Sequence, residues 1–149
     1  AEGLKHVTEM AILNANYLAS SFEKLGFKIL FKGKQGRVGH EMIWDCSAFN
    51  KEYGISELDI AKRLMDFGFH APTLSFPVHG TLMVEPTESE PKEELDRFIE
   101  ALKTIREEMC EVAEGKADKT DNVLKNAPHT HKVLTADEWT HTYPRSKAA

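Results

Sequence analysis

The order of apolar patterns along the chain restricts its fold more than any other feature. Three stretches carry apolar residues at every third or fourth position, the spacing of one face of an amphipathic helix. They are residues 7–25, 58–65 and 95–112. Two pairs of short strand-like runs alternate with them, 27–31 with 38–46 and 74–78 with 81–85. The order α-β-β-α-β-β-α predicts an α+β fold with a mostly antiparallel sheet and helices on one face.

Helix boundaries are marked by residues with a physical reason to stand there. Ser56 is followed three residues later by Asp59, the spacing of a capping box. Ser89, ahead of Pro91, is expected to cap the third helix. A glycine follows the last apolar position of each helix, where a left-handed residue is favoured. These glycines are Gly26, Gly68 and Gly115.

Composition excludes several classes of protein. The chain has 149 residues, 41% of them hydrophobic and 29% charged, as expected for one globular domain. Its formal net charge of −5 argues against a nucleic-acid partner, and no apolar run is long enough to cross a membrane. Only Cys46 and Cys110 are present, which favours a reducing compartment over a disulfide framework.

Two regions are expected within this domain. Residues 1–115 hold the seven predicted elements, whereas 116–149 are polar and lack sustained periodicity. We predict an extended C-terminal segment that wraps the surface. The first residues show neither an initiator Met nor a signal-peptide pattern, and we expect the chain to be a fragment of something longer.

Most motifs that suggest chemistry have a simpler structural explanation. Residues 31–37 contain two glycines and three cations, but they precede a strand, so a hairpin turn is favoured over a phosphate-binding loop. The cluster His129, His131, His141 with Asp137 lacks metal-ligand spacing, and no metal is predicted. No recognisable nucleophile–base pattern occurs either. We predict no catalytic residue in this chain.

The second strand pair is the most unusual segment. It is dense in polar groups, and Pro77 removes a ladder donor, which predicts an edge strand or a bulge. His70 and Thr73 flank the proline turn that enters it, where a ring nitrogen and a hydroxyl could reach a ligand; a purely structural role is the alternative. His40 and Glu41 adjoin on the other predicted hairpin, where neighbouring side chains should face opposite sides.

Ten short stretches spread over the chain resemble glycine dehydrogenase (decarboxylating), the P-protein family of the glycine cleavage system. They include Gly68-Phe-His-Ala-Pro-Thr73 and Asn126-Ala-Pro-His129. The others are residues 15–18, 39–41, 59–64, 81–90, 94–98, 105–108, 137–139 and 143–145. Because the resemblance covers nearly the whole chain, it is not a chance match of one motif, and it falls on the C-terminal part of the family.

The resemblance implies the small C-terminal domain of a fold-type-I pyridoxal-phosphate enzyme. The complete enzyme decarboxylates glycine and passes the aminomethyl group to the lipoyl arm of the H-protein. The family's Schiff-base lysine lies in the large domain, so Lys132 is not its counterpart. We therefore expect the chain alone neither to bind pyridoxal phosphate tightly nor to decarboxylate glycine.

Many relatives of this fold type grip the substrate carboxylate with an arginine on the second strand pair, and residues 75–83 contain none. A decarboxylase gains from that absence, because a strong ion pair would stabilise the ground-state carboxylate more than the departing carbon dioxide. We take four polar residues as the hypothetical substrate-facing lining. They are His70, Thr73, His79 and Thr81.

The implied partners are the large pyridoxal-phosphate domain, the lipoylated H-protein and further subunits of a homo-oligomer or heterotetramer. The implied location is the bacterial cytoplasm or the mitochondrial matrix. A domain without its partner should expose an apolar face, for which Trp44, Phe49 and Phe76 are candidates. The alternative is a non-catalytic α+β protein-interaction module.

Overall fold

The computed structural model describes residues 2–149 and divides the chain into two compact units. Unit 1 comprises Ala1–Cys46 and Pro72–Glu100, and unit 2 comprises Ser47–Ala71 and Ala101–Ala149. Ala1, with which the predicted region 1–115 begins, lies outside the described residues. The boundary at residue 115 stays a prediction.

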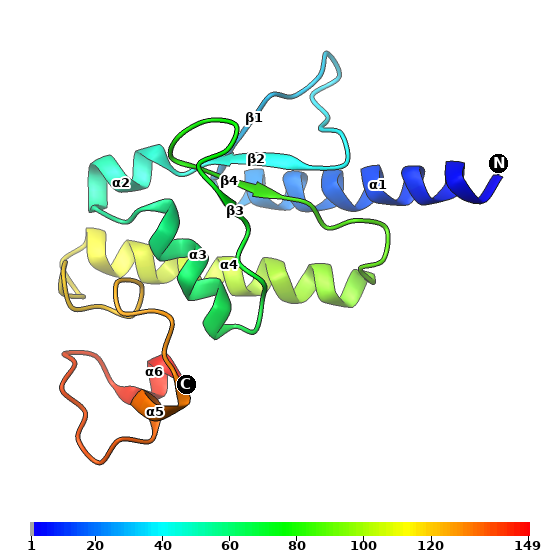
Figure 1. Ribbon diagram of the computed structural model, residues 1–149. Helices are drawn as coiled ribbons and strands as arrows, with labels where there is room; N and C mark the ends of the chain where they lie inside the picture. The colour runs from blue at the N-terminus through cyan, green and yellow to red at the C-terminus, as the bar shows by residue number, and fades with distance from the viewer. Residues whose placement is uncertain (1) are drawn as a thin grey trace. The chain divides into compact units, whose positions relative to one another are not determined.

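Unit 1 is built around a four-stranded sheet (Figure 1). Its strands are β1 (Lys28–Leu30), β2 (Met42–Asp45), β3 (Thr73–Leu74) and β4 (Thr81–Val84). They lie in the order β1-β2-β4-β3, and every neighbouring pair is antiparallel. Trp44 of β2 stands between Ile29 and Leu82, so one row of apolar side chains crosses the sheet. The predicted antiparallel α+β fold is confirmed.

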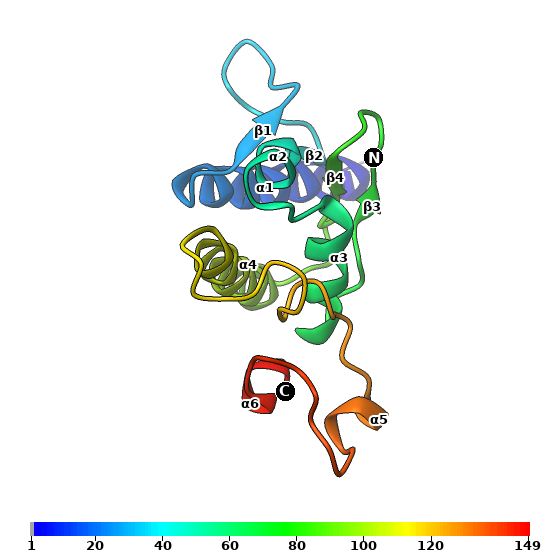
Figure 2. The ribbon, with the colours of Figure 1, turned by 90° about the vertical axis from the view of Figure 1, so that its left-hand side faces the viewer.

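Two helices pack on the Trp44 face of this sheet (Figures 1 and 2). They are α1 (Glu2–Lys24) and the first part of α4 (Lys92–Ala113), which continues into unit 2. Phe22 of α1 meets the Trp44 ring edge-on at 5.2 Å and lies 6.0 Å from the ring of Phe98 on α4. Phe27 completes the cluster, 4.5 Å from Trp44. The predicted apolar stripes therefore meet around one aromatic core.

Unit 2 is helical. It contains α2 (Ser47–Tyr53), α3 (Glu57–Asp66), the second part of α4, α5 (His131–Leu134) and α6 (Arg145–Ala148). Its fully buried side chains come from α3, from α4, from Ile55 between α2 and α3, and from the predicted extended segment. They include Ile60, Leu64, Leu102, Ile105, Met109 and Leu124. Residues 116–149 thus contribute two short helices and buried side chains.

The structure differs from the predicted elements at several ends. The short helix α2 was not expected, so a second helix precedes α3. Of the predicted strand 74–78, β3 retains only the beginning, because Ser75 adopts a left-handed φ of 52° and Pro77 has no N–H to donate. As Pro77 indicated, β3 lies at the edge of the sheet. The helix α4 begins at Lys92, so the expectation that Ser89 caps it is wrong.

The expectation for His40 and Glu41 is also wrong. Strand β2 begins only at Met42, and both residues lie in the bend before it. Without strand geometry their side chains can converge, and His40 Nε2 lies 3.9 Å from Glu41 Oε2 and 3.8 Å from Glu85 Oε1.

Over residues 2–149, no helix has the length and apolar character needed to cross a membrane.

Candidate functional site

Three of the four predicted lining residues lie on the hairpin of β3 and β4, and His79 lies in the loop between these strands. The two ends of this loop are joined where Ser75 N–H donates to the Thr81 carbonyl at 2.7 Å. The Thr81 hydroxyl donates to the Val78 carbonyl at 2.5 Å, and Gly80 N–H donates to Ser75 Oγ at 3.3 Å. Gly80 has a φ of +81°, which a residue with a side chain rarely adopts. These bonds fix the loop by its own polar groups.

The hairpin exposes two of the predicted residues and buries a third. Thr73 and His79 are exposed, and His79 Nδ1 lies 3.3 Å from Ser75 Oγ. Thr81 is only 1% exposed, so its hydroxyl acts on the loop and does not reach solvent. His70 is exposed too, but it belongs to unit 2.

Two of the three residues expected to form an exposed apolar face are buried. Trp44 has no exposed surface and Phe49 is 9% exposed, so neither can be part of an apolar surface. Phe76, at 59%, is exposed as expected. Trp44 was misassigned because its position in the strand pattern does not reveal which face the helices cover.

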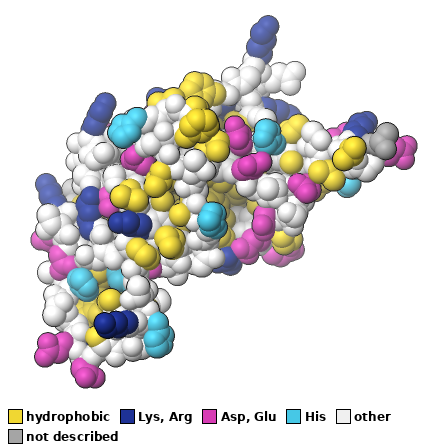
Figure 3. Space-filling model, viewed as in Figure 1, with side chains coloured by type: hydrophobic (Ala, Val, Ile, Leu, Met, Phe, Trp, Pro, Cys, Tyr) yellow, Lys and Arg dark blue, Asp and Glu magenta, His cyan; other side chains and the backbone are white. Residues whose placement is uncertain are grey.

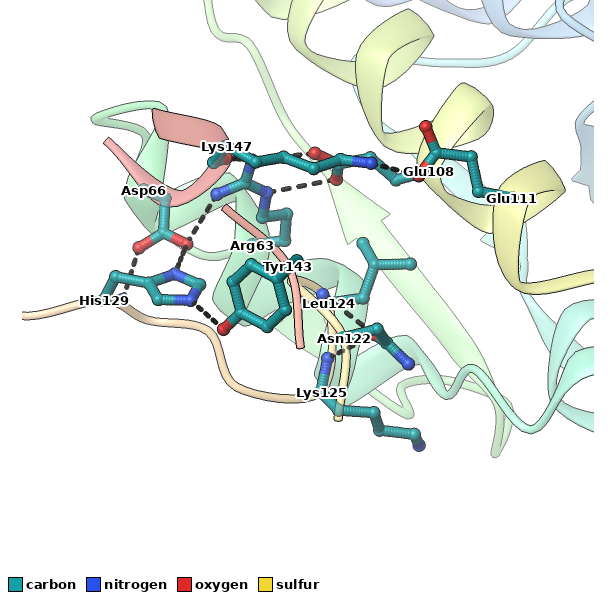
Figure 4. A network of polar contacts seen from close by, with 10 residues as sticks. All are labelled: Arg63, Asp66, Glu108, Glu111, Asn122, Leu124, Lys125, His129, Tyr143 and Lys147. Carbon is teal, nitrogen blue, oxygen red and sulfur yellow. Dashed lines mark hydrogen bonds and ion pairs between the residues drawn. The ribbon is translucent and has the colours of Figure 1, made fainter. Parts of the chain in front are cut away.

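A buried ionic network holds unit 2 together (Figure 4). Arg63 of α3 donates two hydrogen bonds to the carboxylate of Glu108 on α4, at 2.8 and 3.1 Å. It also donates to Asp66 at 2.9 Å and to the Lys147 carbonyl at 2.8 Å. The side chains of Arg63, Asp66 and Glu108 are each at most 5% exposed. A single guanidinium therefore joins α3, α4 and α6.

The network extends through His129 into the C-terminal segment. Asp66 accepts the backbone N–H of His129 at 2.6 Å and lies 2.7 Å from its Nδ1. On the other side of the ring, Nε2 lies 2.7 Å from the hydroxyl of Tyr143. Sequence reasoning missed this role, although the resemblance already included both the Asn126–His129 and Tyr143–Arg145 stretches.

Burial and pairing act against each other on these groups. Burial disfavours the charged guanidinium, but the hydrogen bonds and charges of Glu108 and Asp66 outweigh it and raise the pKa of Arg63. Burial raises the pKa of Glu108, and Arg63 only partly offsets that shift. Burial also raises the pKa of the Tyr143 phenol. Such pairing is what permits ionised side chains in a protein interior.

A cavity of about 320 Å³ lies beside the network within unit 2. Its lining combines charged side chains, among them Glu108, Asp121 and Lys147, with apolar ones such as Val112 and Leu124. Burial alone would raise the pKa of Asp121, but hydrogen bonds from Thr142, His141 and Asn126 lower it to about 2. Both oxygens of the Asp121 carboxylate therefore already accept hydrogen bonds from the protein.

Two histidines considered for a metal cluster pair with different carboxylates. His129 contacts Asp66, whereas His141 Nδ1 lies 2.8 Å from Asp121. In the described part of the chain, no three His, Cys, Asp or Glu side chains are placed to share a metal ion.

Comparison with known proteins assigns this chain to a family. The family model described as glycine dehydrogenase, C-terminal domain, matches residues 7–129. The chain is 59% identical over 148 residues to a glycine dehydrogenase (decarboxylating) of Akkermansia muciniphila. It is 58% identical over 149 residues to the proteins of that name from Bordetella avium and Bacteroides fragilis. The chain belongs to the glycine dehydrogenase family.

The match covers 99–100% of this chain but only 16% of each of these three relatives. It confirms the resemblance read from the short motifs, and it supports a domain of this enzyme family over an unrelated interaction module. Lys132 is exposed on the four-residue helix α5 and lines no part of the cavity.

Proposed function

We propose that this chain is the small C-terminal domain of a glycine dehydrogenase that decarboxylates glycine and transfers the aminomethyl group to the lipoyl arm of the H-protein. The single observation that carries the proposal is the match of the whole chain, at 58–59% identity, to enzymes of that name. Pyridoxal phosphate would supply the electron sink and would be held by the large domain. The other partners are that large domain, the H-protein and further subunits of a homo-oligomer or heterotetramer.

The contribution of this domain would be to present polar groups to the active-site cleft. Thr73 and His79 are exposed on or beside the β3–β4 loop, and exposed His70 precedes it in sequence. Thr81 would act indirectly, because its hydroxyl fixes the Val78 carbonyl. Hydrogen-bonding groups other than an arginine suit a substrate whose carboxylate leaves as carbon dioxide, since a bidentate guanidinium would favour the ground state more strongly.

The location that fits this proposal is the cytoplasm of a bacterium or the mitochondrial matrix. The relatives from Akkermansia, Bordetella and Bacteroides are bacterial, which favours the first.

A hybrid enzyme tests the proposed function. In the Akkermansia relative, the segment that matches this chain is replaced by residues 1–149, giving what we call the hybrid enzyme. We expect glycine-dependent bicarbonate exchange in the presence of pyridoxal phosphate and lipoylated H-protein. The relative truncated before the same segment is the control, and we expect it to be inactive. A folded hybrid enzyme that binds the cofactor but shows no exchange would contradict the proposal.

The lining is tested in the same enzyme. We expect His79→Ala and His70→Ala to lower kcat/KM by about tenfold each, the loss of one hydrogen bond made to the reacting substrate. Thr73→Ala should have a similar but smaller effect. Thr81→Val, which removes only the loop-fixing hydroxyl, should lower thermal stability as well. Unchanged kinetics for the three exposed positions would remove them from the active site.

A further inference from the structure

The apolar stripe of α1 is covered along only half of its length. Ala15, Leu18 and Phe22 are at most 1% exposed and face the sheet of unit 1. Toward the N-terminus the helix continues past the strands (Figure 1). There Leu4 is 76% exposed and Val7 is 42% exposed.

The exposed residues belong to the same stripe as the buried ones. From Phe22 backward, steps of three or four residues lead to Leu18, Ala15, Ala11, Val7 and Leu4. Residues so spaced share one face of a helix. The ion pair of Lys5 with Glu9, 3.6 Å apart, lies on another side of these turns. Figure 3 shows hydrophobic side chains on the projecting turns of α1, among charged ones.

An amphipathic helix end of this kind indicates an interface. Its apolar positions continue the pattern that buries the rest of the helix, yet among residues 2–149 they stay exposed to solvent. Apolar side chains in such a row commonly mark a surface that another protein segment covers. The remaining question is which segment that is.

We propose that Leu4 and Val7 are covered by the part of the same polypeptide that precedes this domain in the full-length enzyme. This inference rests on the proposed function for the identity of the partner. The matched region is a C-terminal domain and makes up 16% of each compared relative, so most of the relative's chain lies ahead of the residues that correspond to α1. In such a relative, the preceding part is joined directly to the helix that corresponds to α1, at the end where Leu4 and Val7 lie.

The size of the stripe favours a tethered partner over a second copy. A stable contact between separate proteins buries about 1,200–2,000 Å² in total, which two turns of one helix do not offer. A covalently linked segment has a high effective concentration and can therefore occupy a small contact.

Thiol labelling of Leu4→Cys tests the contact directly. The variant is made in the isolated chain and in the hybrid enzyme, and maleimide labelling of the N-terminal peptide is followed by mass spectrometry. We expect rapid labelling in the isolated chain at every concentration and labelling at least about tenfold slower in the hybrid enzyme, as for a site exposed only by local opening. Protection in the isolated chain that increases with concentration would overturn the proposal in favour of a second copy.

A pair of matched variants tests the face of the helix. Leu4→Asp combined with Val7→Asp should lower the melting temperature of the hybrid enzyme by several degrees and leave that of the isolated chain nearly unchanged. The control is Leu13→Asp, at a side chain that is also exposed, at 59%, but off the stripe. It should have equal effects in both proteins. Equal effects of the stripe variant in both proteins would also overturn the proposal.

The two proposals fail in different ways. If the hybrid enzyme is inactive but its Leu4→Cys thiol is protected, the contact stands and the proposed function does not. If the hybrid enzyme is active and the thiol is as reactive as in the isolated chain, the contact is refuted and the proposed function stands.

Discussion

Unit 1 is held together by aromatic rings that pack against one another, whereas unit 2 encloses a group of ionised side chains. In unit 1, Phe22, Phe27 and Phe98 surround Trp44, whose indole N–H is buried without a hydrogen-bond partner. In unit 2, Arg63 carries four hydrogen bonds to Glu108, Asp66 and a carbonyl of α6.

This contrast between the two cores shows how each unit selects its native arrangement. The burial of apolar surface is non-directional, and such a core tolerates replacements of similar shape. A buried guanidinium must instead find every acceptor, because an unpaired buried charge is strongly destabilising. Unit 2 therefore brings distant segments together through geometry, and unit 1 does so through shape and area. The following predictions test that contrast, beginning with the largest effect.

Trp44→Ala should remove the centre of the unit 1 core. We expect a loss of about 4 kcal/mol in the free energy of unfolding, since a large cavity replaces the ring. Trp44→Phe should lose only about 1–2 kcal/mol, because no hydrogen bond is broken and most of the volume is kept. Urea titration measures both. Phe31→Ala, at a side chain 68% exposed, is the control. A similar loss for all three variants would contradict the shape-based account.

Arg63→Ala should test the ionic core. We expect a loss of about 3 kcal/mol, since Glu108 and Asp66 would remain buried without their cation. The matched control is Arg97→Ala: Arg97 pairs with Glu94 at the same three-residue spacing, but both side chains are over a third exposed, and we expect a loss of less than about 1 kcal/mol. Unfolding by urea measures each. Comparable losses would mean that burial does not separate the two arginines.

Ser56→Ala should show how much local capping adds to unit 2. The Ser56 hydroxyl accepts the Asp59 N–H at 3.3 Å, and the Asp59 carboxylate accepts the Ser56 N–H at 2.8 Å. Loss of the cap should cost about 1 kcal/mol, measured by thermal unfolding. Ser89→Ala is the control, because Ser89 lies ahead of α4 without capping it. Equal losses would restore the expected capping role of Ser89.

Asp121→Asn should have the smallest effect and a dependence on pH. The folded-state pKa of Asp121 is lowered to about 2 from 3.8, so its ionised form stabilises the fold. That contribution is complete above about pH 4 and disappears as the pH falls through about 2. The melting temperatures of the wild type and the variant should therefore differ at pH 7 and converge toward pH 2. Asp137→Asn, at an exposed carboxylate, should show no such convergence.

Predictions from the sequence succeeded where one residue pattern acts locally. The stripe from Val7 to Phe22 predicted α1, and Gly26 indeed has a left-handed φ of 83°. The capping box at Ser56 is present with both of its hydrogen bonds. Pro77 predicted an edge strand or a bulge, and β3, which ends shortly before it, lies at the edge of the sheet.

The ionic network could not be predicted because its members are far apart in sequence. Arg63 and Glu108 are separated by 45 residues, and Asp66 and His129 by 63. In the sequence, the charged residues Arg63, Asp66 and Glu108 look like ordinary solvent-exposed residues of amphipathic helices. The sequence did hold one signal that the C-terminal segment is ordered. Asp and Asn are frequent in residues 118–126, where their side chains can hydrogen-bond the local backbone. Asn122 does so, accepting the N–H groups of Leu124 and Lys125, and it orders a segment that lacks periodicity.

By itself, the sequence determined the α+β class, the antiparallel pairing and the family to which the domain belongs. These follow from periodicity, turn residues and motifs, which are local in the chain. Only the tertiary structure decided that Trp44 is central to a core, that Thr81 is buried and that His129 joins the C-terminal segment to α3. The physical reason is that burial and charge pairing depend on which distant side chains meet, and a local pattern does not specify those partners.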